Sequence, residues 1–212
     1  LGVARLRIYK RGLWARESGI RSLFSETQHM PEPLDLDAIA REVKAAQDDA
    51  RQIAPITSRF GGFDVSAGYA VADLIHRARV REGAVPIGRK IGFTNPAMWA
   101  RYGVRDPIWA HVYDTTVVYA RAGHVTCDVG QFSEPLIEPE VVFHFRSAPR
   151  SDQRLTELLG CVDWIADAFE IVQSHFPKWR FAAADTVADS GLHGRLLVGE
   201  PPEIEDADRR GV

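Results

Sequence analysis

One ten-residue run limits how this chain can fold, because it combines a strand-like pattern with two carboxylates. Residues 136–145 read LIEPEVVFHF, and their aliphatic and aromatic side chains are typical of a β-strand that belongs to a core. Glu138 and Glu140 stand inside this run, one residue apart. Successive side chains of a strand point to opposite faces, so the two carboxylates must share one face. The fold therefore has to accommodate two neighbouring negative charges.

The spacing of Glu138 and Glu140 leaves two interpretations open. Two ionised carboxylates in a poorly solvated place repel each other, and a cation that prefers oxygen ligands, such as Mg²⁺, Mn²⁺ or Ca²⁺, would remove the conflict. Glu170, which has apolar neighbours on both sides, is then the candidate third ligand. The alternative is an edge strand whose solvent face carries both glutamates. Pro139 between them donates no backbone hydrogen bond, which suits an edge or a bulge.

Lys90 is a second candidate for chemistry. It lies in the segment GRKIGFT between Gly88 and Gly92, and small residues let the backbone and a ligand approach closely. A partly buried lysine can take part in proton transfer, whereas a lysine on the surface of a short strand is the alternative. The glycine spacing matches neither a dinucleotide-binding fingerprint nor a Walker A loop.

The histidines are less informative. His144 alternates onto the same face as the two glutamates, where it could bind a metal or act as an acid–base group, or simply pack as an imidazole. His111, His175 and His193 could each reach a site, and the sequence selects none of them. No serine nucleophile elbow of the G-x-S-x-G type is present in the sequence.

Composition excludes several classes of function. The chain has 212 residues, of which 45% are hydrophobic and 26% charged, and its net charge of −3 gives no basic footprint for nucleic acid or an anionic membrane. Cys127 and Cys161 have no CxxC spacing, so we expect no disulfide framework and a reducing, cytoplasmic environment. No apolar run approaches the roughly 18 residues of a membrane span.

The order of elements predicts an α+β domain with a mostly β core. Apolar periodicity predicts a helix from Leu36, capped by Asp35, and a second helix from about Asp64. A compact helix is expected over residues 94–103, and strands are expected over residues 108–120 and 124–129. A third helix is expected over residues 155–165, with a strand around Glu170 after it.

Three segments are expected along the chain. Residues 1–29 are rich in arginine and begin with Leu, and we expect them to be a non-native or disordered extension. Residues 30–199 are expected to form the domain, which looks truncated at its C-terminal end. Residues 200–212 are expected to form a polar tail.

Three sequence motifs, which follow one another in this order, resemble those of a known family. They are GRKIGFTNPAMWARYGVRDPIW, LIEPEVVF and FEIVQSHFPKWRFAAADTVADSGLHG. Together they are similar to the 2-oxopent-4-enoate hydratase and 4-oxalocrotonate decarboxylase branch of the fumarylacetoacetate hydrolase superfamily. The resemblance covers roughly residues 36–199 and implies a helical N-terminal portion followed by a mixed, β-barrel-like core that is incomplete at its C-terminal end.

The resemblance also implies roles for particular residues. The acidic pair of the family matches Glu138 and Glu140, its third acidic ligand matches Glu170, and together they would hold Mg²⁺ or Mn²⁺. The family lysine matches Lys90, which would move a proton when a dienol becomes a ketone.

The segment ADTVADSG would line the pocket. Asp185 and Asp189 are its candidate substrate-binding residues, with capping or turn roles as the alternative.

The implied reaction is metal-dependent addition of water to a 2-hydroxy-2,4-dienoate in the breakdown of aromatic compounds. Decarboxylation of a 2-oxo-3-hexenedioate, C–C hydrolysis, and a catalytically incomplete metal-binding subunit stay open as alternatives. Ile108 follows Pro107 where hydratases often carry an acid, and Ala110 and His111 replace a small pair that contains glycine. The expected partners are a small 2-oxo or 2-hydroxydienoic acid and further copies of this chain or a related decarboxylase.

Overall fold

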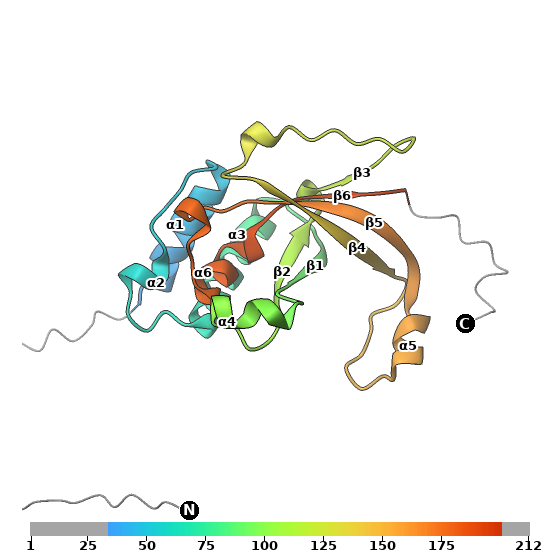
Figure 1. The fold of residues 1–212 in the computed structure, drawn as a ribbon, viewed down its shortest axis with the longest axis horizontal. Helices are drawn as coiled ribbons and strands as arrows, with labels where there is room; N and C mark the ends of the chain where they lie inside the picture. The colour runs from blue at the N-terminus through green and yellow to red at the C-terminus, as the bar shows by residue number, and fades with distance from the viewer. Residues whose placement is uncertain (1–33, 201–212) are drawn as a thin grey trace, which may run out of the picture. The chain divides into compact units, whose positions relative to one another are not determined.

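The computed structural model describes residues 34–200, in which most helices lie together at one end, and the helix Leu155–Gly160 lies at the far end beside the strands Leu136–Phe145 and Val162–Val172 (Figure 1). The extension expected over residues 1–29 and almost all of the tail expected over residues 200–212 lie outside these residues. The helices are α1 (Leu36–Asp48), α2 (Ile56–Arg59), α3 (Val65–Arg81), α4 (Trp99–Tyr102), α5 (Leu155–Gly160) and α6 (Ala183–Ala188). The strands are β1 (Pro86–Gly92), β2 (Ile108–Tyr113), β3 (Val117–Tyr119), β4 (Leu136–Phe145), β5 (Val162–Val172) and β6 (His193–Val198).

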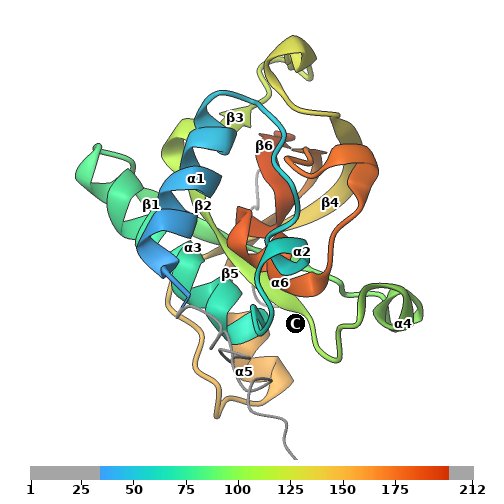
Figure 2. The same cartoon turned by 90° about the vertical axis from the view of Figure 1, so that its left-hand side faces the viewer.

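The two long helices begin where the sequence predicts. The carboxylates of Asp35 and Asp64 each accept a hydrogen bond at 2.9 Å from the backbone N–H three residues further on, which satisfies a free donor of α1 and of α3. Their apolar stripes pack with α6 into one hydrophobic core, and Figure 2 shows α1, α3 and α6 close together. A glycine allows the close approach of α3 and α6, because a Cβ at Gly68 would lie 2.7 Å from the carbonyl oxygen of Ala184.

The strands form two open sheets. Strands β1 and β2 pair antiparallel, and the other sheet has the order β3-β6-β5-β4, in which β3 and β6 are parallel and the remaining pairs are antiparallel. The β-barrel-like core that we expected is therefore not closed within residues 34–200. Closure requires the edge strands to pair, and among these residues β3 and β4 each pair on one side only.

Strand β4 is one of the two edge strands of its sheet, in contrast to the core strand that its composition suggests. The face opposite the glutamates is largely uncovered. Its half-exposed apolar residues are Ile137, Val141, Phe143, Phe145, Ile165 and Phe169. The alternative interpretation is thus correct that this segment is an edge strand. Its other part, that both glutamates lie on a solvent face, does not follow from the strand order.

The third helix is shorter than expected. We expected a helix over residues 155–165, but α5 ends at Gly160, and Val162 and Ile165 belong to β5. Their β-branched side chains favour a strand, and β5 pairs with β4 along its length, so tertiary pairing outweighs the helical spacing. Among the described residues, no helix is both long and apolar enough to cross a lipid bilayer.

Candidate active site

Strand pairing brings the three predicted acidic residues together. Glu138 lies directly opposite Glu170 in the antiparallel register of β4 and β5, and Glu140 follows on the same face. One ligand oxygen from each of the three residues lies within 4.8 Å of the other two. The residues differ in exposure, since Glu138 is exposed, Glu140 half-buried and Glu170 buried. This arrangement concentrates negative charge where the sheet meets the rest of the domain.

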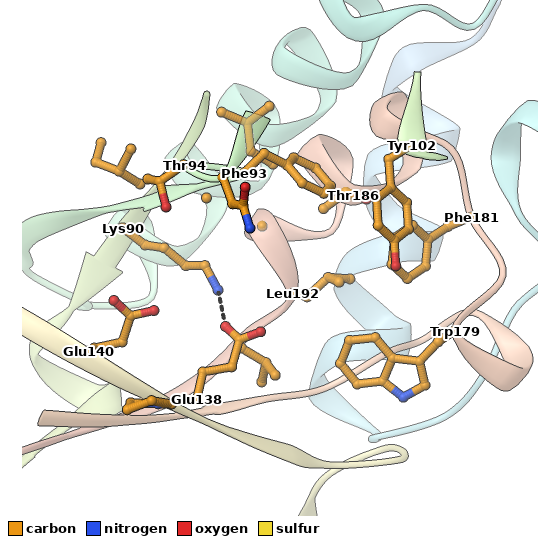
Figure 3. A pocket seen from close by; sticks show the side chains of 17 residues that line it. Lys90, Phe93, Thr94, Tyr102, Glu138, Glu140, Trp179, Phe181, Thr186 and Leu192 are labelled. Carbon is orange, nitrogen blue, oxygen red and sulfur yellow. Dashed lines mark ion pairs between the residues drawn. The ribbon is translucent and has the colours of Figure 1, made fainter. Parts of the chain in front are cut away.

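Lys90 comes from the other sheet and points into this cluster. Its Nζ atom lies 2.8 Å from Oε2 of Glu170. The same atom lies 3.9 Å from Oε2 of Glu138, the contact that Figure 3 shows as a dashed line. Two glycines lie beside its aliphatic stem, and a Cβ at Gly92 or at Gly191 would be in ordinary van der Waals contact with Cε of Lys90, at 3.8 Å. Gly191 also has a φ of +64°, which side chains rarely adopt. Gly88, the other glycine of the segment, has open space around it.

These groups border a cavity of about 340 Å³. Its charged residues Lys90, Glu138 and Glu140 lie at one end, and Tyr102, Trp179 and Phe181 form an aromatic wall across from them (Figure 3). The rings of Tyr102 and Phe181 stack with their centroids 5.5 Å apart. The cavity therefore has an anionic end beside a lysine and an aromatic end.

Trp179 is held in the aromatic wall by a specific turn. Its Nε1–H donates to the carbonyl oxygen of Glu134 at 3.1 Å, and the Glu134 carboxylate accepts from the backbone N–H of Lys178 at 3.0 Å. Lys178 and Trp179 both have positive φ values, +59° and +55°. These contacts maintain an uncommon backbone conformation that places the indole beside the cavity.

Two of the acidic residues have pKa values shifted in opposite directions. Burial raises the pKa of Glu140, the negative charge of Glu170 adds to the rise, and Lys90 only partly offsets it. Burial also opposes ionisation of Glu170, but the hydrogen bond from His193 and the charge of Lys90 outweigh it and lower the pKa of Glu170. The cluster therefore contains one firmly ionised carboxylate and one that takes up a proton more readily.

His193 is a member of this site that the sequence did not select. Its Nδ1 lies 2.6 Å from Oε1 of Glu170, and its Nε2 lies 2.8 Å from Oγ1 of Thr116. Glu170 thus contacts Lys90 through one oxygen and His193 through the other. No spacing rule relates residues 116, 170 and 193, because their proximity depends on how β6 pairs with β5 and β3.

Asp185 and Asp189, the predicted substrate-binding residues, lie behind the cavity wall. The Asp185 carboxylate accepts from the backbone N–H and the hydroxyl of Thr57, at 2.9 and 2.6 Å. Asp189 contacts Nδ1 of His175 at 2.8 Å and accepts from the side-chain amide of Gln47 at 3.0 Å. Both carboxylates are buried, and neither is among the residues that line the cavity. These contacts join distant parts of the chain, and Asp185 also caps α6 by accepting from the backbone N–H of Ala182 at 2.9 Å, so a role in substrate binding stays a prediction.

The other candidate histidines lie outside the cluster. His144 stacks on Trp164 with centroids 4.7 Å apart, and its Nδ1 lies 3.3 Å from a carboxylate oxygen of Asp163. His111 stacks on His76 beside α3, where burial and the neighbouring His76 lower its pKa. Of the candidate histidines, the structure therefore brings only His193 to the cluster of Glu138, Glu140 and Glu170.

The fold and this cluster define a mixed α/β domain with a cavity lined by Lys90, Glu138 and Glu140, next to which the buried carboxylate of Glu170 contacts Lys90. The chain is homologous to curated 2-keto-4-pentenoate hydratases and to 4-oxalocrotonate decarboxylase. It is 31% identical to 2-keto-4-pentenoate hydratase 1 of Dechloromonas aromatica (strain RCB) over 177 residues, which are 82% of this chain and 66% of the relative. It is 28% identical to 4-oxalocrotonate decarboxylase of Pseudomonas sp over 155 residues, 72% of this chain and 59% of the relative.

The structural comparison agrees at the level of the fold. The 4-oxalocrotonate decarboxylase from Pseudomonas putida G7, complexed with magnesium and adipate, superposes with a TM-score of 0.72 at 23% identity. The match covers 77% of this chain and 62% of that chain. The chain spans just under two thirds of the length of the curated hydratases that it matches first, 66% and 62%. No family model matches the chain.

Proposed function

We propose that this chain belongs to the fumarylacetoacetate hydrolase superfamily and is a divalent-metal-dependent hydratase of a 2-hydroxy-2,4-dienoate. The observation that carries the proposal is the convergence of Glu138, Glu140 and Glu170 beside Lys90 at one end of a cavity. Related proteins named 2-keto-4-pentenoate hydratase and 2-hydroxyhexa-2,4-dienoate hydratase supply the reaction class.

The donor set fits a hard divalent cation. All three candidate ligands are carboxylates, their oxygens lie within 4.8 Å of one another, and a cation would relieve the repulsion that raises the pKa of Glu140. Mg²⁺ and Mn²⁺ are the cations proposed to bind here. When bound, such an ion supplies Lewis-acid stabilisation of negative charge on a substrate oxygen.

Lys90 is proposed to move the proton. Its Nζ lies at the carboxylate end of the cavity, where Glu170 orients it through a contact of 2.8 Å. A 2-hydroxydienoate that becomes a 2-oxo acid loses a proton from its hydroxyl and gains one on carbon. An amine held at that end of the cavity can deliver or accept this proton, and the resulting conjugated ketone is open to addition of water.

The aromatic wall favours a substrate with one carboxylate. Of the described residues that line the cavity, Lys90 is the one cation, and it lies at the carboxylate end. A second carboxylate at the far end would lie against Tyr102, Trp179 and Phe181, where burial without a partner is unfavourable. An apolar tail is compatible with that surface. This favours a dienoate over a hexenedioate.

Decarboxylation of a 2-oxo-3-hexenedioate is the second candidate. Ile108, an apolar residue where hydratases often carry an acid, is buried and lines the cavity. The structural neighbour with a TM-score of 0.72 is itself a decarboxylase. A metal-binding subunit without turnover of its own is a third candidate, which the three converging carboxylates also fit.

An ultraviolet assay with product identification tests the proposal. The 212-residue chain would be incubated with 2-hydroxypenta-2,4-dienoate, 2-hydroxyhexa-2,4-dienoate and 2-oxo-3-hexenedioate, each with Mg²⁺, with Mn²⁺ and with EDTA. We expect metal-dependent loss of the two monocarboxylates, with a product heavier by one water. Release of CO₂ from the dicarboxylate would favour the second candidate, and metal binding without turnover of any substrate would favour the third.

A further inference from the structure

His193 links the candidate metal ligand Glu170 to a residue on a different part of the sheet. Its side chain is 4% exposed, and both ring nitrogens have partners, Glu170 on one side and Thr116 on the other. Thr116 ends the short helical turn Asp114–Thr116 that leads into β3, whereas Glu170 lies on β5. The imidazole therefore spans from one strand connection to the acidic cluster.

Both ring nitrogens of His193 lie within hydrogen-bond distance of an oxygen. The hydroxyl of Thr116 donates to the carbonyl oxygen of Tyr113 at 3.0 Å, and its oxygen lies 2.8 Å from Nε2 of His193. At the other end of the ring, Nδ1 lies 2.6 Å from Oε1 of Glu170. The ring orientation is thus fixed from both sides.

This contact leaves the two oxygens of Glu170 with different surroundings. Oε1 contacts His193, and Oε2 lies 2.8 Å from Nζ of Lys90. The carboxylate cannot rotate about its last bond without losing both contacts. Oε2 is therefore the oxygen that remains directed toward Lys90.

The backbone before His193 has an uncommon conformation that supports the same placement. Ser190, Gly191 and Leu192 have φ values of +53°, +64° and +63°, three consecutive residues in the left-handed region. A hydrogen bond of 2.9 Å from the N–H of Leu192 to the carbonyl oxygen of Asp189 closes this turn. Such conformations persist where the surrounding contacts determine them, and they concentrate at functional sites. The turn ends at the residue that contacts Glu170.

Close packing of β6 on β5 also keeps the His193 side chain beside Glu170. A Cβ at Gly194 would lie 2.7 Å from the carbonyl oxygen of Ile171 and 3.2 Å from the ring of Phe132. A larger residue there would push the start of β6 away from the strand that carries Glu170. The glycine after His193 therefore keeps the imidazole within hydrogen-bond distance.

We propose that Thr116 and His193 are positioning residues that orient the Glu170 carboxylate, so that one oxygen is held by His193 and the other serves the cation and Lys90. The part that concerns the cation depends on the proposed metal site. Partners of this kind commonly determine ligand orientation, and their loss lowers metal affinity by about 10–100-fold.

Calorimetric titration of the full chain with MnCl₂ alone tests this assignment. We expect His193→Leu to raise the dissociation constant for Mn²⁺ by about 10–100-fold. His193→Asn should recover most of the affinity, because its side-chain amide can donate to Oε1 from near the position of Nδ1. Thr116→Val should weaken binding less, and Thr116→Ser, which keeps the hydroxyl, should resemble the wild type.

His144→Leu is the matched control, since His144 lies on β4 outside the cluster and should leave Mn²⁺ affinity unchanged. Melting temperatures in EDTA show whether each variant is folded. If His193→Leu does not fold, the Mn²⁺ affinities of the two Thr116 variants and of His193→Asn test the assignment. Wild-type affinity in a folded His193→Leu protein, or no difference between Thr116→Val and Thr116→Ser, would overturn the assignment. A wild type that binds no Mn²⁺ would overturn both this inference and the metal site, whereas binding without dienoate turnover would overturn the proposed reaction alone.

Discussion

The helical region and the β4–β5 region use apolar residues in opposite ways. In the helical region, Val43, Ile56 and Val71 are fully buried in one continuous core. On β4 and β5, residues of the same type such as Val141 and Phe143 are about half exposed, at 54% and 48%, while the carboxylates occupy the other face. The difference indicates that the buried helical core contributes most to stability and that the β4–β5 region contributes the reactive groups. Substitutions in the helical core should therefore lower the free energy of unfolding, and substitutions of the carboxylates should lower turnover.

Removal of a carboxylate is the strongest test of this separation. We expect Glu138→Ala and Glu140→Ala each to reduce Mg²⁺-dependent turnover of a 2-hydroxydienoate by about 1,000-fold or more, because the metal's stabilisation of charge contributes several kcal/mol. In EDTA, the melting temperature of Glu138→Ala should stay close to that of the wild type, since the side chain of Glu138 is 51% exposed. Asp152→Ala, which removes a carboxylate from an exposed loop, is the control. Unchanged turnover in either glutamate variant would refute the metal assignment.

Substitution of Lys90 should separate proton transfer from metal binding. We expect Lys90→Ala to lower the turnover rate by about 10²–10⁴-fold, the usual contribution of a general acid or base. The dissociation constant for Mn²⁺ should change only a few-fold, because the three carboxylates remain. Arg89→Ala is the control, since the Arg89 guanidinium lies over the Trp109 ring, 4.6 Å from its centroid. Loss of Mn²⁺ binding in Lys90→Ala, measured by calorimetry, would indicate a structural role instead.

A pair of phenylalanine substitutions tests the stability side of the comparison. Phe176 is fully buried in the helical core and Phe143 is 48% exposed on β4. We expect Phe176→Ala to lower the free energy of unfolding by about 3–5 kcal/mol. Phe143→Ala should change it by about 0.5 kcal/mol or less. Urea unfolding curves measure both, and a large loss in Phe143→Ala would mean that this face of β4 is covered in solution.

The sequence predicts the parts of this molecule that depend on local pattern. Asp35 and Asp64 stand before apolar stripes, so the starts of α1 and α3 follow from capping and period. Alternation along a strand predicts the shared face of Glu138 and Glu140 whether or not the strand is buried. The proximity of Glu170 follows once β4 and β5 are paired in the observed register.

The parts that the sequence does not predict depend on pairing between distant strands. His193 reaches Glu170 because of three left-handed residues and a register irregularity between Ile171 and Val172, and no periodicity reports either feature. The expected helix over residues 155–165 was confirmed as far as Gly160, and its second half was wrong for a related reason, because that half pairs with β4. Long-range pairing overrides local spacing in both places.

The smallest expected effect concerns the charge of Glu140 in the absence of metal. The pKa of Glu140 is raised by burial and by Glu170, so protonation of this residue favours the folded state, and its ionised form destabilises that state above the raised pKa. In EDTA at neutral pH, Glu140→Gln should raise the melting temperature by about 1–2 °C, the range expected for less than 1 kcal/mol in a domain of this size. The gain should shrink as pH falls through the raised pKa, where the wild-type side chain also becomes neutral.

With saturating Mg²⁺, Glu140→Gln should instead have a lower melting temperature than the wild type, because the variant loses a ligand that stabilises the bound form. Scanning fluorimetry from neutral to acidic pH measures both effects, with Glu82→Gln on the exposed end of α3 as the control. A lower melting temperature of Glu140→Gln in EDTA would show that the three carboxylates do not repel one another in the folded chain, and the balance of charges inferred for the sheet region would then be wrong.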